Sequence, residues 1–353
     1  GECECPQGFV GDPTVACRRP SDDTGIPRAD TPVRHDVGAA CRGVDCGENA
    51  VCEGGDCRCR SGYGGNPYQK CEPKNQQRCG TDGCGTGSHC IGGVCECSPG
   101  WETTPQGDCE RPEPSAPAGR TRVEVCERWT KSRMSPGSQL WSQSPAGACD
   151  DGQLAESVQF DSLRRLNAYR WLVGVAPVTT EDTYVRRAHA CATALAARGE
   201  GLNPNLAQTD PCYSDAAKKG MANSSLAKGL SHPAKSIQLF IKDRAPRVGH
   251  RRWLLSPVLG ATGFGFREGY ACVYSLDNGG ADARSDVFYP PRGFFPKSAL
   301  VGPWSYLSRD TKITSAAEVS ITKVRDGTSV RVTDLRAAQG SFGQIDGLLW
   351  RVP

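Results

Sequence analysis

The stretch RVGHRRWLLSP, residues 247–257, places an imidazole next to guanidinium groups. His250 is one of five histidines in the chain, and Asp243 precedes it at the end of a stretch with helical periodicity. An imidazole and a carboxylate within hydrogen-bond reach can transfer a proton, and both are also metal ligands. Whether the pair performs catalysis, binds a metal ion or only stabilises the fold depends on what the rest of the chain places around it.

Two long stretches before this pair have the periodicity of amphipathic helices. SLRRLNAYRWLVG, residues 162–174, repeats apolar residues at three-residue steps. EDTYVRRAHACATALAARG, residues 181–199, opens with acidic residues, carries a stripe that includes Tyr184, Cys191 and Leu195, and closes with glycine. We therefore expect two helices on the amino-terminal side of the pair.

A third helix and two strands complete the surroundings of the pair. HPAKSIQLFIKD, residues 232–243, has Pro233 at the expected first helical position and Asp243 at its end. GATGFGF, residues 260–266, and YACVYSL, residues 270–276, have the composition of strands. Helices followed by strands predict an α/β domain, with His250 on the connection between the two kinds of element.

LNAYR, GHRRW and the later aromatic strand, in this order, resemble motifs of the CAP superfamily, which includes cysteine-rich secretory and pathogenesis-related proteins. The secreted bacterial members are the most similar. The resemblance implies a small α–β–α sandwich over residues 149–282.

Members of that family often carry a cavity with two histidines and two acidic residues. By resemblance, His250 corresponds to the second histidine, and Phe240 with Asp243 corresponds to an aromatic residue and its following acid. Asn203 stands where the first histidine belongs, and Ser224 or Ser225 where the other acid belongs. The motif residues carried over are Asn167, Arg170, Asn203, Ser224, Phe240, Asp243, His250, Arg251, Arg252 and Trp253.

Two of the four ionisable groups of this cavity are therefore replaced by neutral side chains. A transition-metal site needs about three protein ligands, so we expect no metal, no other cofactor and no catalytic residue, with His250 and Asp243 as a remnant pair. His189 and His232 are expected to be structural.

The remnant pair is then expected to be architectural. The imidazole of His250 would hydrogen-bond Asp243 and backbone, and Trp253 would help to anchor the segment in the core. Arg251 and Arg252 are expected to point apart, one toward solvent and one toward internal carbonyl or carboxylate oxygens.

Cysteine usage places the protein outside the cytoplasm. The chain has 20 cysteines in 353 residues, and most of them lie before residue 110. Such density is typical of secreted modules in which disulfides replace a hydrophobic core. We expect a secreted, extracellular or cell-surface protein.

Six cysteines from Cys41 to Cys71 show gaps that recur from Cys79 to Cys109. With a C-x-C pair and a Gly-aromatic turn before the last cysteine, the two runs resemble EGF-like modules, at residues 41–72 and 79–110. Residues 1–17 resemble the second half of another. The resemblance implies the bridges Cys41–Cys52, Cys46–Cys57, Cys59–Cys71, Cys79–Cys90, Cys84–Cys95, Cys97–Cys109 and Cys5–Cys17, and it leaves the partner of Cys3 upstream. The acidic residues of calcium-binding modules are missing.

Residues 18–40 and 111–148 are expected to be linkers, the second rich in proline and including a connector. In the central domain, Cys191 and Cys212 enclose a short loop and are expected to pair. Bacterial CAP-like proteins suggest Cys149–Cys272. Cys126 stays unassigned, with Cys126–Cys149 as the competing pair.

Residues 283–353 have the pattern of a small all-β domain. Two alternating stretches flank the turn RDGT, residues 325–328, which predicts a hairpin, and GLLWRVP would add one more strand. The region resembles the β-sandwich that follows the CAP unit in some bacterial proteins. We expect an incomplete sandwich, which is either trimmed at its end or completed by another chain.

The function expected from these observations is extracellular binding, adhesion or assembly by a multidomain, non-enzymatic protein. The net charge of +3 is too small to indicate a nucleic-acid partner, and no stretch is apolar enough to span a membrane. The expected partner is an extracellular protein or glycan, and self-assembly through the EGF-like modules or an open strand edge is a further option. The alternatives are a secreted hydrolase that uses His250 and Asp243, and a lipid- or small-ligand-binding protein.

Overall fold

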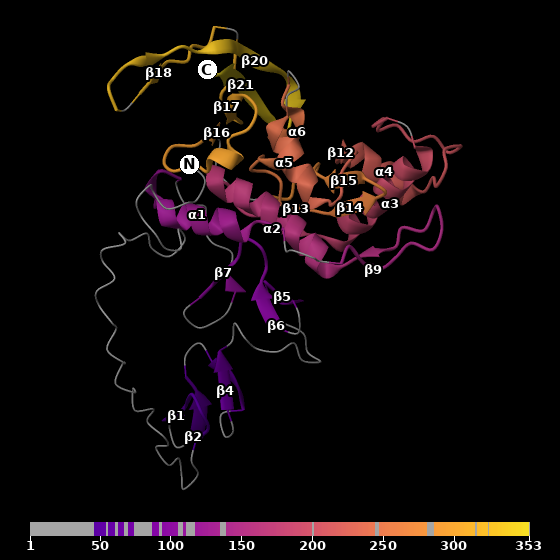
Figure 1. Ribbon diagram of the computed structural model, residues 1–353, viewed down its shortest axis with the longest axis vertical. Helices are drawn as coiled ribbons and strands as arrows, with labels where there is room; N and C mark the ends of the chain where they lie inside the picture. Colours follow the sequence, from indigo (N-terminus) through magenta and orange to yellow (C-terminus); the bar gives the residue numbers. More distant parts are fainter. Residues whose placement is uncertain are drawn as a thin grey trace, which may run out of the picture. The chain divides into compact units, whose positions relative to one another are not determined.

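The computed structural model describes most of the chain from residue 46 onward. The described residues are 46–53, 56–60, 63–66, 70–73, 87–91, 94–104, 109–110, 117–134, 139–199, 201–243, 247–280, 286–314, 316–323 and 325–352. The chain divides into two compact units, one within Glu4–Pro112 and one that contains Glu113–Pro353 (Figure 1). The protein is therefore multidomain, as expected.

The unit within Glu4–Pro112 consists of short antiparallel hairpins closed by disulfides. Their strands are β1 Ala50–Glu53, β2 Asp56–Cys59, β3 Tyr63–Asn66, β4 Lys70–Pro73, β5 Ser88–Ile91, β6 Val94–Cys97, β7 Glu102–Thr103 and β8 Cys109–Glu110. The bridges Cys46–Cys57, Cys59–Cys71 and Cys97–Cys109 are those that the EGF-like pattern implies. Cys52 and Cys95 are also disulfide-bonded. The other implied bridges each involve a cysteine whose side chain lies outside the described residues.

The second unit contains the helices and two main sheets. Its helices are α1 Arg122–Lys131, α2 Glu156–Val173, α3 Asp182–Arg198, α4 Asp215–Asn223, α5 Ala234–Lys242 and α6 Gly249–Leu254, with short turns η3 Pro117–Gly119 and η4 Lys297–Ala299. Its strands before residue 280 are β9 Trp141–Gln143, β10 Gln153–Leu154, β11 Thr179–Thr180, β12 Ser224–Ala227, β13 Ala261–Thr262, β14 Phe264–Arg267 and β15 Tyr270–Tyr274. Helices α2, α3 and α5 and strands β14 and β15 lie where the sequence predicts them.

Helix α1 forms inside the stretch that was expected to be a linker. Thr121 and Glu124 make a reciprocal capping box, in which each side chain accepts the other residue's backbone N–H. This arrangement satisfies two backbone donors that a helix start leaves unpaired. The sequence contained the capping signal, but the surrounding prolines obscured it.

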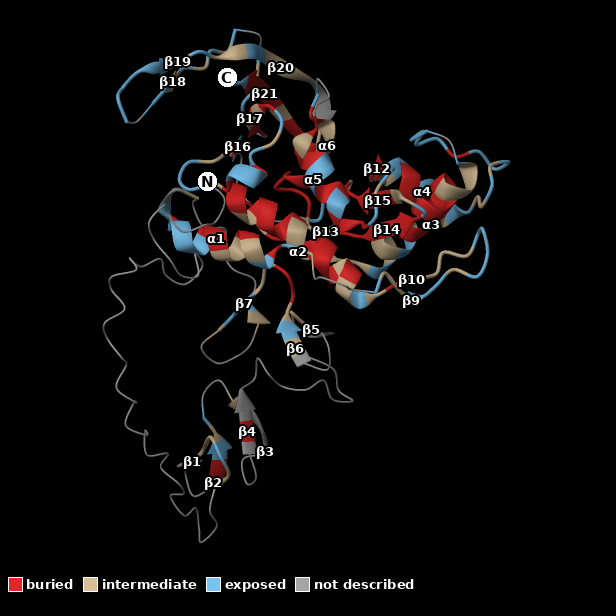
Figure 2. Ribbon diagram, viewed as in Figure 1, coloured by how far each residue is buried: buried red, intermediate tan, exposed pale blue. Residues whose placement is uncertain are grey.

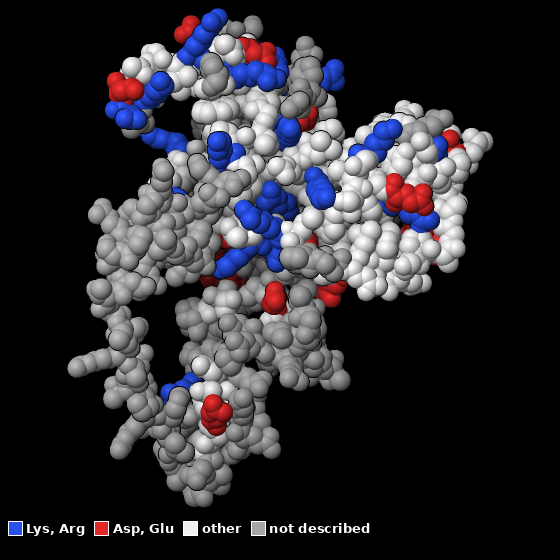
Figure 3. Space-filling model, in the orientation of Figure 1, with Lys and Arg blue, Asp and Glu red and all other residues white. Residues whose placement is uncertain are grey.

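Helix α1 packs on α2 through arginine–aromatic contacts. The guanidinium of Arg165 lies 3.8 Å from the centre of the Trp129 ring, and Arg120 lies 3.9 Å from that of Trp171. Lys and Arg side chains gather over α2 in the space-filling view (Figure 3). Trp129 and Arg120 are both buried, so these cation–π contacts belong to the interface between the helices, where each contributes about 1–2 kcal/mol.

Strands β12, β15 and β14 form an antiparallel sheet between two helical layers, in that order. Leu226 and Cys272 point into a cluster built by α3 and α4. Their neighbours Ala227, Ala271 and Val273 point into a larger cluster built by α2 and α5. Since successive strand residues alternate between faces, each face of the sheet is buried by a different helix pair. The result is an α–β–α arrangement with most buried residues at its centre (Figure 2).

Helix α3 approaches the sheet at van der Waals distance because a glycine faces it. A Cβ atom on Gly265 in β14 would lie 1.9 Å from the carbonyl oxygen of Ala188. Only a residue without a side chain allows the α3 backbone to lie this close to the strand.

The last part of the chain forms one four-stranded antiparallel sheet in the order β16, β17, β21, β20. These strands are β16 Asp286–Tyr289, β17 Trp304–Ser308, β20 Thr333–Phe342 and β21 Ile345–Arg351, and β18 Ile321–Thr322 with β19 Ser329–Val330 forms a separate hairpin beside RDGT. One face of the sheet supplies Val287, Tyr289, Leu307 and Ile345 to the larger cluster that α2 and α5 also build. The sheet therefore shares the core of the α–β–α body, and within the described residues no second sheet packs on it as a sandwich would require.

The pairing of the four cysteines in the body corrects the sequence expectation. The bridges are Cys149–Cys212 and Cys191–Cys272, instead of Cys191–Cys212 and Cys149–Cys272. Cys191 faces the sheet from the buried side of α3, where β15 presents Cys272, and both are fully buried. Cys212 lies on the connection before α4, near the carbonyl of Ala148. Closeness in sequence was therefore a poor guide, because a helix fixes the direction of its side chains.

Cys126 in α1 is also disulfide-bonded, and its competing partner Cys149 is taken by Cys212. In the described part of the chain, no helix combines the length and hydrophobicity that crossing a membrane requires.

Candidate functional site

His250 and Asp243 lie together at the junction of α5 and α6. The buried carboxylate of Asp243 accepts the backbone N–H of His250 at 2.9 Å, and its same oxygen lies 3.4 Å from Nδ1 of the imidazole. The Phe240 ring packs beside the imidazole, with 4.9 Å between centroids. The three residues that the resemblance brought together on this helix and its successor are thus neighbours.

The two members of the pair differ sharply in exposure. The Asp243 side chain is 4% exposed, whereas the His250 side chain is 45% exposed. The aspartate is therefore part of the packed interior, and it accepts a hydrogen bond from a backbone donor. The imidazole lies at the rim, where solvent reaches it.

A strained backbone forms the start of α6. Val248 precedes the helix with φ of 42°, in the left-handed region, and its side chain is fully buried. This conformation is an outlier for a β-branched residue and costs about 1–3 kcal/mol. The surrounding packing must maintain it, and it aims the His250 N–H at Asp243.

The two neutral residues that the resemblance places in the same cavity, Asn203 and Ser224, have no hydrogen bond to His250 or Asp243 among the described contacts. Asn203 is exposed, and its side chain accepts the N–H of Asn205 at 3.0 Å. Ser224 begins β12 opposite Tyr274, and its buried hydroxyl has no hydrogen-bond partner. Among the described residues, no group of three or more His, Cys, Asp or Glu side chains is arranged to hold a metal ion.

The arginines after His250 are both buried, which corrects the expectation that one points to solvent. Arg251 donates to the carbonyls of Ile241 at 2.7 Å, Pro303 at 2.6 Å and Val301 at 3.0 Å. Its guanidinium also lies 4.2 Å from the centre of the Tyr289 ring. Burial lowers the pKa of Arg251 to about 10, so the side chain stays charged at neutral pH.

Arg252 binds the neighbouring strand in the same manner. Its Nε donates to the carbonyl of Ile345 at 3.1 Å, and burial lowers its pKa to about 10. Ser256, which follows on the same segment, donates its hydroxyl proton to the carbonyl of Gly343 at 2.6 Å. The segment after His250 therefore holds both the α5 end and the carboxy-terminal sheet.

The LNAYR motif of α2 also binds the segment that follows His250. Arg170 donates to the carbonyls of Ala176 and Leu254 at 2.8 Å, Ser256 at 2.9 Å and Leu259 at 3.1 Å. Asn167 exchanges two hydrogen bonds of 2.8 Å with the backbone of Val178. Both motifs thus use their polar side chains to satisfy backbone groups in the interior.

Sequence reasoning missed the acceptors of these arginines. They are carbonyls at Val301, Pro303 and Ile345, and a carbonyl has no side-chain signature. The available signal was RRWLL itself, since two adjacent arginines within an apolar run must bury at least one guanidinium.

The pair can transfer a proton and form hydrogen bonds. Its solvent-exposed imidazole is accessible to a ligand, yet within the described residues no hydroxyl or thiol is hydrogen-bonded to His250. No protein-family model, curated protein or solved structure matches the chain.

Proposed function

We propose that this chain is an extracellular binding protein, in which EGF-like modules precede a CAP-like body, and that it binds an extracellular protein or glycan without chemical turnover. The disulfide-closed hairpins and the α–β–α layering support the two resemblances. Disulfides of this density are typical of proteins that work outside the cytoplasm.

One observation carries this proposal: the motif residues donate to backbone carbonyls. Arg170, Arg251 and Arg252 direct their guanidinium groups to interior carbonyl oxygens, and Asp243 accepts a backbone N–H. Groups used in this way stabilise a scaffold. They are not poised to activate water or to stabilise charge on a substrate, as a hydrolase requires.

The half-exposed His250 beside Asp243 is the feature that favours the rival function, a secreted hydrolase. The test compares the full chain with His250→Ala in two assays. One assay measures binding to immobilised extracellular proteins and glycans of defined composition, and the other measures hydrolysis of fluorogenic peptides and of cell-wall polymer.

We expect saturable binding to a component of the panel by both proteins and no turnover by either. Turnover by the parent chain that His250→Ala abolishes, at an unchanged melting temperature, would establish the hydrolase instead. A hydrophobic molecule that co-purifies and is identified by mass spectrometry would favour lipid capture.

A further inference from the structure

A polar pocket lies away from His250, between the β9–β10 hairpin and α3. Its volume is about 550 Å³. One wall comes from the hairpin and its loop, and the other from one face of α3. The lining residues are Gln143, Asp150, Asp151, Gly152, Gln153, Asp182, Val185, Arg186, His189 and Ala216.

The pocket carries negative charge in a chain whose net charge is positive. Its lining includes the carboxyl groups of Asp150, Asp151 and Asp182 against the single guanidinium of Arg186. The whole chain has a net charge of +3. A local excess of carboxylates in a concave, partly desolvated surface attracts cations.

His189 gives an independent indication that a ligand belongs there. This residue lines the pocket although it is only 7% exposed. The side-chain amide nitrogen of Gln159 donates to the carbonyl of Phe264 at 2.7 Å, which fixes the orientation of the amide. The same nitrogen lies 3.2 Å from Nε2 of His189, so Nε2 must be the acceptor and the proton of the neutral ring resides on Nδ1.

The Nδ1–H donor of His189 is buried and has no partner. A buried donor without an acceptor costs about 1–3 kcal/mol, and a ligand oxygen that reached it would remove that cost. Burial lowers the pKa of His189 to about 4, so the ring stays neutral and does not repel a bound cation.

The carboxyl groups around His189 have different roles. The two carboxylate oxygens of Asp150 accept the backbone N–H groups of Ala146 and Gly152, at 2.7 and 3.1 Å, and these bonds stabilise the loop. Asp151 is half-buried and hydrogen-bonded to Thr193, and burial raises its pKa. Asp182 is exposed at the first position of α3. Because the oxygens of Asp150 accept backbone N–H groups of the loop, Asp151 and Asp182 are the lining carboxylates that can contact a cationic ligand.

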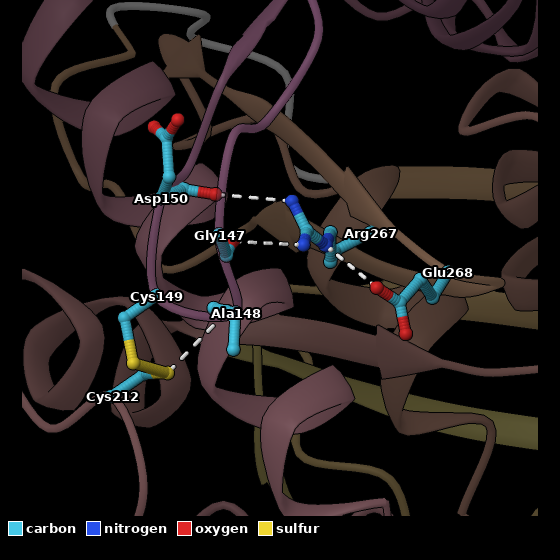
Figure 4. Close-up of a disulfide and its surroundings, with 7 residues drawn as sticks. All are labelled: Gly147, Ala148, Cys149, Asp150, Cys212, Arg267 and Glu268. Carbon is cyan, nitrogen blue, oxygen red and sulfur yellow. Dashed lines mark hydrogen bonds and ion pairs between the residues drawn. A yellow bond between two sulfur atoms is a disulfide. The ribbon is translucent and has the colours of Figure 1, made fainter.

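The hairpin wall is held in place by covalent and polar contacts. Cys149 is bonded to Cys212 on the connection before α4, and Arg267 donates to the carbonyls of Gly147 and Asp150, both at 3.1 Å (Figure 4). A rigid wall reduces the entropy lost on binding a small group.

We propose that this pocket binds the amino terminus of a peptide, with the α-ammonium group between Asp151 and Asp182 and the adjacent carbonyl oxygen accepting from Nδ1 of His189. An ammonium group with an oxygen acceptor close by matches both features of the site. The lining contains no aromatic side chain, which disfavours a sugar ring because such rings usually stack on one. The inference rests on the proposed binding function and names the chemistry of one partner.

The experiment titrates the full chain with glycylglycinamide at pH 6.5 by calorimetry, where the α-ammonium group is charged. The matched probe is N-acetylglycylglycinamide, which keeps the carbonyls and loses the charge. Glucosamine and N-acetylglucosamine form the corresponding sugar pair. The variants are Asp182→Asn, Asp151→Asn and His189→Gln, and the control is Asp310→Asn, an exposed aspartate that follows β17 and does not line the pocket.

We expect the free peptide to bind and its acetylated form not to. Each of the three pocket variants should weaken binding about tenfold, since each removes a charge or a hydrogen bond to the charged end of the ligand, and Asp310→Asn should leave it unchanged. Equal binding of both peptides, unchanged affinity in Asp182→Asn and Asp151→Asn, stronger binding of glucosamine, or no binding at millimolar concentration would each overturn the assignment. If binding to the macromolecular panel persists in that case, the general binding function stands and only the peptide site is wrong.

Discussion

The guanidinium of Arg170 in α2 donates to the carbonyl oxygen of Leu254 in α6 at a distance of 2.8 Å, across 84 positions of the chain. The two sequence motifs that resemble the same family are thus joined directly, by a side chain of one and a backbone group of the other. Through Ser256 and Leu259, Arg170 also binds the connection that leads into β13 and β14. The polar residues of both motifs are best understood as a single interior network.

Arg170→Lys should destabilise the protein by about 2–4 kcal/mol, because a lysine ammonium keeps the charge but cannot reach all four carbonyls that the guanidinium binds. Chemical denaturation followed by tryptophan fluorescence measures the free energy of unfolding. Arg292→Lys, at an exposed position, is the control and should change it by less than about 0.5 kcal/mol. Equal stability of the two variants would show that the network contributes little.

Asp243→Ala should cost more stability than His250→Ala. The alanine at 243 removes the acceptor of the His250 backbone N–H and costs about 2 kcal/mol, whereas the half-exposed imidazole contributes less than about 1 kcal/mol. Asp243→Asn keeps an acceptor oxygen and should recover most of the loss. Thermal unfolding of the three variants checks the order. A reversed order would show that the His250 imidazole stabilises this junction more than the Asp243 carboxylate does.

The sequence predicted the regular elements well and the long-range partners poorly. The apolar stripe of α3 and the RDGT turn between β18 and β19 are local signals, since both depend on residues within one element. Two of the carbonyl acceptors of Arg251, those of Val301 and Pro303, lie about fifty residues downstream, and no pattern of side chains encodes them.

The pocket beside α3 was likewise hidden in the sequence. His189 was expected to be structural because its position on a long helix gives no indication of a neighbouring hairpin. Gln143 and Gln153 belong to short strands, of which the first lies in the segment that was taken as a linker. Only the three-dimensional pairing of β9 with β10 places their loop against α3.

Gly265→Ala should destabilise the body because the new methyl group would lie 1.9 Å from the Ala188 carbonyl oxygen. Helix α3 must move away from the sheet, at a cost of about 3 kcal/mol or more. The control is Gly201→Ala, where a Cβ atom meets nothing within 4 Å. Denaturant midpoints of the two variants provide the comparison, and an unchanged midpoint for Gly265→Ala would mean that the α3–β14 contact is looser than described.

Acidification should reduce stability through His189. Burial lowers the pKa of this imidazole from 6.5 to about 4. Below pH 6.5 the unfolded chain takes up a proton that the folded protein does not accept until about pH 4, so the free energy of unfolding falls as the pH falls through this window, by about 3 kcal/mol at most. Above pH 6.5 the effect is absent because both states are neutral.

The measurement is the free energy of unfolding between pH 7 and pH 4 for the parent chain and for His189→Gln. The variant should lose stability less steeply with falling pH. Burial raises the pKa of Asp151, so this carboxyl group makes the free energy of unfolding rise as the pH falls. It does so in both proteins, and its contribution therefore cancels when the two curves are subtracted. Identical slopes would show that the imidazole is protonated in the folded protein as readily as in the unfolded chain.

Mild reduction should open Cys149–Cys212 before Cys191–Cys272. Cys149 is exposed at the surface of its loop, whereas Cys191 and Cys272 are both fully buried between α3 and the sheet. Thiol–disulfide exchange needs direct access to a sulfur atom, so a reductant under native conditions reaches the first bridge and not the second. Alkylation followed by peptide mass spectrometry should therefore label Cys149 and Cys212.

Loss of this bridge removes a loop constraint worth about 4 kcal/mol in the chain-entropy model and releases the hairpin wall of the pocket. Peptide binding should then weaken while the α–β–α body, which keeps Cys191–Cys272, stays folded by circular dichroism. Simultaneous labelling of all four cysteines would mean that the two bridges open together in one unfolding event, and labelling of Cys191 with Cys212 alone would restore the pairing that closeness in sequence suggested.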